Sequence, residues 1–224
     1  MDIKSRSLPS LSLYMCLAAI VLCFAARTDA QVRRPAVGRA AAPKVEPNTI
    51  HIRKFTGLGS KGKVRTPVFR ASSSRAALNP PGDWIQITTE YSTSKDWTDE
   101  LVFHYYVMTE TKIKGETVYS FFRATVRYGD VERSTRHIST VFLRPNTVKR
   151  FGEPIGIGVE IVYGGQVAAK KEEVLRSGGL PEGDWWKNPK VTDNPKVKSR
   201  GGYLLNRSET PFALVNIDDH EAIR

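Results

Sequence analysis

The stretch IGIGVEIVY at residues 155–163 decides the fold class, because it contains the cleanest alternation in the 224-residue chain. Every second position from Ile155 to Tyr163 carries a large apolar side chain, and Gly156, Gly158 and Glu160 lie between them. A period of two residues is typical of a β-strand. The glycines at 164 and 165 then favour a tight turn. The stretch therefore predicts a strand that turns back on itself.

Similar patterns extend outward in both directions. Alternating or apolar runs predict strands at 85–91, 101–108, 118–128 and 135–143, and shorter ones at 203–205 and 211–217. Residues 166–176 favour a strand followed by a helical turn, and 180–200 a polar loop with several prolines. Many short strands without a long helix indicate an all-β fold. We predict an antiparallel β-sandwich with immunoglobulin-like topology and no disulfide.

The first thirty residues have the pattern of a secretory signal peptide. Lys4 and Arg6 precede an apolar run at 11–26, and Thr28-Asp29-Ala30 offers a cleavage site. The alternative is an uncleaved anchor, but a span needs about 20 apolar residues. Both cysteines, Cys16 and Cys23, lie in this segment, so the mature chain has no disulfide or catalytic thiol. We expect a periplasmic, outer-surface or secreted protein with no transmembrane span after cleavage.

The net charge of +11 is unevenly distributed. Residues 31–75 hold eleven basic residues and one acidic residue, whereas 76–224 hold twenty of each. We therefore divide the chain into a signal peptide (1–30), a basic, partly disordered arm and linker (31–82) and a β-sandwich domain (83–224). Within the arm, Ile50 and Ile52 alternate with polar residues, which suits an edge strand docked on a sheet.

The arm has enough positive charge to attract anionic polymers. The candidate contacts are Arg33, Arg34, Arg53, Lys54, Lys61, Lys63 and Arg65. Only Phe55 and Phe69 interleave them, which argues against base stacking and against a specific nucleic-acid partner. The alternative is a flexible leader followed by a basic edge strand that resists edge-to-edge pairing.

The adjacent tryptophans Trp185 and Trp186 are the candidate interaction residues of the predicted loop. If both are exposed, they can stack on sugar rings or anchor an interface. The alternative is that at least one closes the open end of the sandwich.

No motif predicts a catalytic or metal site. The four histidines lack metal-ligand spacing, and GLGSKGK at 57–63 lacks the ending of a phosphate-binding loop. We therefore expect a non-enzymatic protein without metal or cofactor. A hydrolase stays as an alternative, which requires a cleft that brings His104 or His137 within hydrogen-bond reach of carboxylates.

Three segments carry a resemblance to a known family. They are VFLRP at 141–145 with Arg150-Phe151, GVEIVY at 158–163, and LLNRSETPF at 204–212. Over about residues 83–217 the chain resembles secreted, pilus-like proteins of the Verrucomicrobia, of the Akkermansia type, which are encoded near type IV pilus genes. The resemblance implies an immunoglobulin-like β-sandwich and carries no catalytic residues.

The resemblance implies a secreted, pilus-associated or envelope structural protein whose partners are other envelope or pilus proteins. A major pilin would have a long apolar helix at the mature N-terminus, but Ala30 is followed by Gln-Val-Arg-Arg-Pro. An accessory or assembly role therefore fits better. The alternative function is a surface module that binds host glycans or anionic polymers.

Overall fold

The computed structural model describes residues 49–67 and 82–214. The chain divides into two units, Met1–Ala41 and Ala42–Arg224, and all described residues belong to the second. The predicted signal peptide, Arg33, Arg34 and the last ten residues lie outside the described residues.

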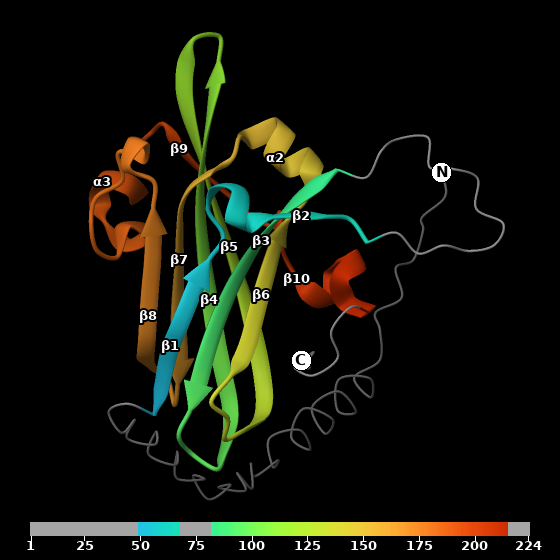
Figure 1. Cartoon of the computed structure of the whole chain (residues 1–224). Coiled ribbons are helices and arrows are strands. Elements are labelled where there is room, and N and C mark those ends of the chain that lie inside the picture. The colour runs from blue at the N-terminus through green and yellow to red at the C-terminus, as the bar shows by residue number, and fades with distance from the viewer. Residues whose placement is uncertain (1–48, 68–81, 215–224) are drawn as a thin grey trace, which may run out of the picture. The chain divides into compact units, whose positions relative to one another are not determined.

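Two sheets form the fold (Figure 1). The first has the order β1-β3-β6-β10, and β2 pairs with β3 beyond the end of β1. Its strands are β1 (Ile50–Thr56), β2 (Lys63–Arg65), β3 (Asp83–Thr93), β6 (His137–Leu143) and β10 (Leu204–Asn206). The second has the order β8-β7-β4-β5-β9. Its strands are β4 (Trp97–Ile113), β5 (Glu116–Glu132), β7 (Pro154–Tyr163), β8 (Gln166–Val174) and β9 (Val197–Arg200).

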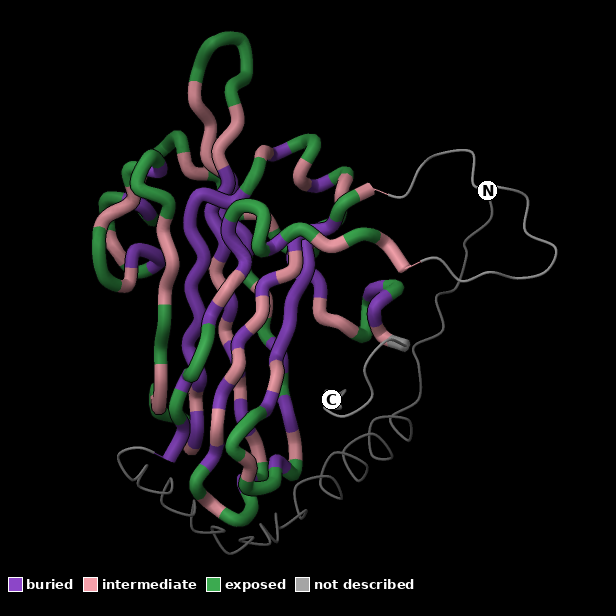
Figure 2. The backbone as a smooth tube through the Cα atoms, viewed as in Figure 1, coloured by how far each residue is buried: buried purple, intermediate pink, exposed green. Residues whose placement is uncertain are grey.

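The prediction of an all-β sandwich is confirmed. Every described strand pair is antiparallel except β5–β9, which is parallel. Alternate residues of the facing strands fill the space between the sheets, and they include Phe103, Tyr105, Val107, Ile157 and Val159, all fully buried. Buried and part-buried residues alternate along β4, whereas β7 is buried almost throughout (Figure 2).

The amino-terminal boundary of the sandwich differs from the predicted one. Ile50, Ile52 and Phe55 of β1 are only 4–7% exposed and belong to the main core, as does Leu58. The edge strand expected around Ile50 and Ile52 is present and pairs with β3. Residues 49–65 are therefore part of the sandwich, because their apolar side chains belong to the core between the two sheets. The sandwich starts before position 83.

Three local predictions also need correction. Strand β8 continues to Val174 instead of turning helical at 170, because its backbone pairs with β7 as far as Gly156. A short helix that the sequence analysis missed, α2 (Pro145–Phe151), follows β6 and starts with proline. Residues Pro211–Leu214 form a 3-10 turn, not a strand, and Phe212 of this turn packs against the ring of Trp84.

The two sheets are joined across the core by hydroxyl groups. The Tyr105 hydroxyl of β4 lies 2.9 Å from Thr89 Oγ1 of β3 and 2.8 Å from Ser139 Oγ of β6. The Tyr128 hydroxyl of β5 donates to the same Ser139 oxygen at 3.0 Å. All four residues are buried. The described residues contain no cysteine, so these hydrogen bonds connect the sheets without a disulfide beside them.

Replacing Tyr105 by Phe should lower the free energy of unfolding by about 1–3 kcal/mol, because the buried hydroxyls of Thr89 and Ser139 lose a shared partner. Urea denaturation measures this change. Tyr119→Phe is the matched control, since Tyr119 is half-buried outside the main core. Equal stability losses in the two variants would show that the network contributes nothing of its own.

Deleting residues 31–75 should abolish cooperative unfolding, because the deletion takes β1, β2 and four core side chains. Each buried apolar side chain contributes about 1.5–3 kcal/mol, against a total stability of about 5–15 kcal/mol. Deleting only 31–48 leaves all these side chains in place and should preserve a cooperative thermal transition. Circular dichroism melts of both truncations test this, and similar curves for the two would refute it.

Candidate functional site

The segment 180–196 covers part of the outer face of the second sheet. It carries Trp185 and Trp186, which are 0% and 3% exposed. The Trp186 ring stacks on Tyr106 of β4 with centroids 5.0 Å apart and 6° between the planes. Trp185 meets the ring of Phe121 of β5 at 5.7 Å. This segment, called the cap below, has its own small core on the sheet.

The glycines at 156 and 158, in the stretch 155–163, leave space for the cap. A Cβ atom at Gly158 would lie 2.4 Å from Cζ3 of Trp186. A Cβ atom at Gly156 would lie 2.4 Å from a methyl carbon of Leu180 and 3.5 Å from Trp185. Glycine inside a strand often marks such a close approach. The two glycines that alternate with apolar residues in this strand therefore also leave the space that the indoles occupy.

Both interpretations of the tryptophan pair need correction. Neither indole is exposed enough to stack on a sugar ring, so neither provides a glycan platform in this structure. They do not close the open end of the sandwich either, because they lie on the outer face of β4, β5 and β7. The alternation of apolar and polar residues could not reveal this burial, since the two tryptophans belong to a loop.

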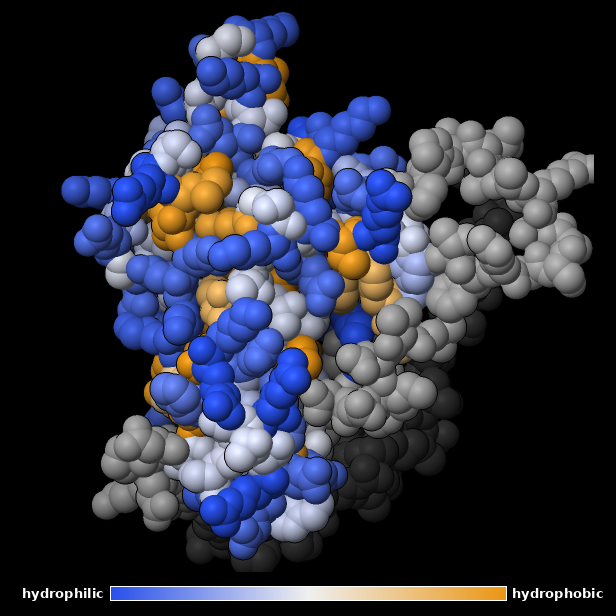
Figure 3. All heavy atoms as spheres, in the orientation of Figure 1, coloured by the Kyte–Doolittle hydropathy of each residue, from blue (hydrophilic) through white to orange (hydrophobic). Residues whose placement is uncertain are grey.

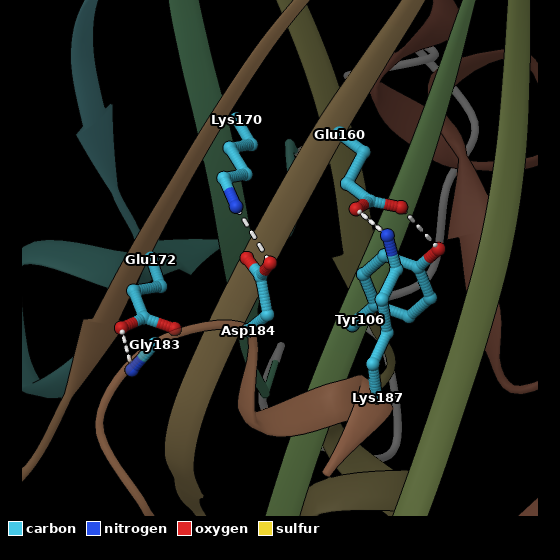
Figure 4. Close-up of polar contacts among 7 residues, drawn as sticks. All are labelled: Tyr106, Glu160, Lys170, Glu172, Gly183, Asp184 and Lys187. Atoms are coloured by element: carbon cyan, nitrogen blue, oxygen red, sulfur yellow. Dashed lines mark hydrogen bonds and ion pairs between the residues drawn. The ribbon is translucent and has the colours of Figure 1, made fainter. Parts of the chain in front are cut away.

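A set of polar contacts fastens the cap to the sheet (Figure 4). Lys187 of the cap forms an ion pair with Glu160 of β7, whose side chain is 4% exposed, and the Tyr106 hydroxyl donates to the same carboxylate at 3.0 Å. Burial and the adjacent carboxylate raise the pKa of Tyr106. The phenol therefore stays protonated and serves as a hydrogen-bond donor.

Two further contacts tie the start of the cap to the edge strand β8. Lys170 Nζ lies 2.6 Å from Asp184 Oδ2, and the backbone N–H of Gly183 donates to Glu172 Oε1 at 2.9 Å. Asp184 has a left-handed backbone with φ of 45°, which orients the chain between these two contacts. The cap is thus attached along one side by charge and over its centre by aromatic packing.

The two histidines considered for hydrolysis lie in different layers. His104 is on the outer face of β4, where its Nδ1 lies 3.1 Å from Thr125 Oγ1, and burial lowers its pKa. His137 is buried, stacks on Tyr91 and places Nε2 2.9 Å from the carbonyl oxygen of Glu132. His104 also lies opposite Glu160 in the β4–β7 pair, but its described hydrogen bond is to a hydroxyl, so the hydrolase alternative stays untested. Within residues 49–67 and 82–214, no cluster of metal-ligating side chains is present.

The basic residues of the predicted arm that are described lie on the sandwich. Arg53 donates to the carbonyl oxygen of Thr135 at 2.8 Å. Three lysine and arginine side chains form ion pairs: Lys54 with Glu90, Lys63 with Glu153, and Arg65 with Asp83. Hydrogen bonding to Glu153 raises the pKa of Lys63. Lys61 is exposed. These contacts fit the alternative of a basic edge strand, and polyanion binding by these residues stays a prediction.

Substituting Gly158 by Ala should displace Trp186, because the new methyl group cannot occupy the space of the indole ring. We expect a red shift of tryptophan fluorescence and faster proteolysis within residues 180–196. Gly201→Ala is the matched control, since its Cβ would meet no atom within 4 Å. An unchanged spectrum and digestion pattern for the Gly158 variant would contradict the packing described here.

Comparison with known proteins agrees with this fold. A crystal structure of a protein from Akkermansia muciniphila is similar, with a TM-score of 0.61 and 20% sequence identity, over 78% of this chain and 92% of that chain. At this identity the likeness concerns the fold alone. No curated protein matches the sequence. A family model matches residues 59–224, which is most of the chain.

The matched range contains all three segments that carried the resemblance, at 141–151, 158–163 and 204–212. It also begins ahead of position 83, in agreement with the corrected start of the sandwich. The chain belongs to the family of pilus-like β-sandwich proteins of the Akkermansia type.

Proposed function

We propose that this chain is a secreted, non-enzymatic structural or interaction protein of a pilus or another envelope assembly, in an accessory role. Its partners are other envelope or pilus proteins. Membership of a pilus-like family supports the general class. Among the described residues, no helix is long and apolar enough to cross a membrane.

The projecting β4–β5 hairpin is the observation that carries the proposal (Figure 1). The two strands pair with each other out to Ile113 and Glu116. Strand β7 pairs with β4 only as far as Thr109, and β9 pairs with β5 only from Tyr119. Within the described residues, both edges of the ribbon 110–118 are therefore open. Open edges and a protruding tip are suited to binding another protein.

The tip combines an apolar centre with a charged rim. Ile113 is 54% exposed, and Lys112, Lys114 and Glu116 surround it. Lys114 and Gly115 both have positive φ, of 52° and 85°, as a tight two-residue hairpin turn requires. Figure 3 shows mostly hydrophilic side chains on the hairpin. An apolar anchor within a polar rim is the usual arrangement of a protein interface.

A photo-crosslinking amino acid at Lys114 should capture one defined envelope or pilus protein in the producing organism, identified by mass spectrometry. The same group at Thr192, an exposed residue of α3 (Pro189–Thr192), is the control and should not capture it. Adding Ile113→Asp should reduce the crosslink at Lys114 about tenfold or more, because a charge replaces the apolar anchor. No specific product from Lys114, or the same products from both positions, would refute the proposal.

A further inference from the structure

The net charge of the described residues is concentrated at the end of the sandwich that carries the hairpin. Residues 49–67 and 82–214 hold 24 basic and 17 acidic side chains, a net charge of +7. Segments 57–65, 82–83, 110–118, 144–153 and 196–203, called the basic end below, hold eleven basic and four acidic ones. The other described residues hold thirteen of each. The whole excess therefore lies at one end.

These segments are neighbours in the fold. Strand β2 pairs with the start of β3, and β9 pairs with β5 at the base of the hairpin. Helix α2 lies beside both, and the backbone oxygen of Glu110 in β4 fits against Gly152 at the end of the helix. The fold thus gathers charges that are far apart in the sequence.

Three neighbouring cations around α2 have no ion pair with a described carboxylate. Some lysine and arginine side chains elsewhere meet acidic partners, as Arg127 meets Glu100 and Arg133 meets Asp96. In contrast, Arg144, Lys149 and Arg150 are exposed without such an ion pair. Unneutralised neighbouring cations raise the local positive potential and attract an anionic ligand.

Two guanidinium groups meet over one aromatic ring. The guanidinium carbon of Arg150 lies 4.9 Å from the centroid of Phe151, and that of Arg200 lies 4.4 Å from the same centroid. Arg200 also donates from Nε to Ser120 Oγ at 3.0 Å, which fixes its position. Each guanidinium therefore packs against the Phe151 ring as a cation–π contact, which places both cations beside the end of α2.

A recess is present among these cations. A hollow of about 270 Å³ is lined by Arg144 and Arg150, with Asn146, Gly202 and Tyr203 opposite them. A second hollow, of about 730 Å³, shares Arg144 and Asn146 and continues past Lys149. Its one carboxylate, Glu209, accepts a hydrogen bond from the backbone of Asn206. The two hollows adjoin each other at Arg144 and Asn146, at the first turn of α2, and are together called the trough below.

We propose that this trough binds a linear acidic polysaccharide, whose carboxylate or sulfate groups contact Arg144, Lys149 and Arg150. The inference is independent of the hairpin and of the proposed pilus role. Two adjoining hollows with cations along them suit a chain with repeating negative charges. Guanidinium groups provide paired donors that match the oxygens of such groups.

Two other polyanions fit the site less well. Single-stranded nucleic acid needs exposed rings for base stacking. Here Trp84 is 7% exposed and donates its indole N–H to Thr66, while Tyr203 packs against Phe151. A flat anionic membrane that approaches along the long axis meets the projecting hairpin before it reaches α2 (Figure 1).

The test measures binding of a fluorescent heparin oligosaccharide and of a polygalacturonate oligomer to the full chain at several salt concentrations. Arg144→Gln with Arg150→Gln removes two cations of the trough. Arg127→Gln with Arg133→Gln removes the same charge from ion-paired positions outside the basic end and serves as the matched control. Both double variants keep the basic residues at 31–48, and thermal melts verify that each is folded.

We expect the trough variant to bind at least one of the two polysaccharides about tenfold or more weakly, with a shallower salt dependence, because charge-assisted hydrogen bonds are lost. The control should stay within about twofold of the parent. Three results would overturn the proposal: no binding of either polysaccharide by the parent, equal losses in both variants, or tighter binding of a thymidine oligonucleotide or of phosphatidylglycerol vesicles with the same dependence on Arg144 and Arg150.

Discussion

The hydrogen bonds among Tyr105, Tyr128, Thr89 and Ser139 are the constraint on which the rest of the sandwich depends. They cross the core and connect the middle strands of both sheets. Each hydroxyl is fully removed from water, so any sliding of one sheet over the other leaves buried polar groups without partners. This requirement fixes the register between the sheets. The cap, α2 and the hairpin are all attached to strands whose positions it sets.

The strands were predictable because their apolar side chains follow a period of two. Residues 85–91, 101–108 and 155–163 show it clearly and form β3, β4 and β7. Strands β2 and β9, with three and four residues, are too short to show a period. The helical composition at 170–176 predicts a helical turn, but pairing with β7 outweighs local propensity as far as Val174.

The candidate sites were harder to predict for a different reason. The tryptophan pair is conspicuous in the sequence, but its burial depends on Gly156 and Gly158, which belong to another segment. The cations of the trough come from α2 and the residue before it, but Trp84 and Tyr203, which also line the hollows, are far away along the chain and meet these cations only after the fold has formed. The charge excess at 31–75 drew attention to the arm, whereas the sandwich itself carries an unpaired group of cations.

The hairpin also has a mechanical consequence. Strand β4 runs without a break for 17 residues, from the far end of the second sheet through its centre to the projecting tip, and β5 runs beside it for the same length. A tension applied between the tip and the far end acts along the strands. When the rest of the sandwich is held, the hydrogen bonds from β4 to β7 are loaded together in shear and do not open one after another. A protein held by its tip in a filament or at a cell surface would resist extension through this arrangement, without a covalent cross-link.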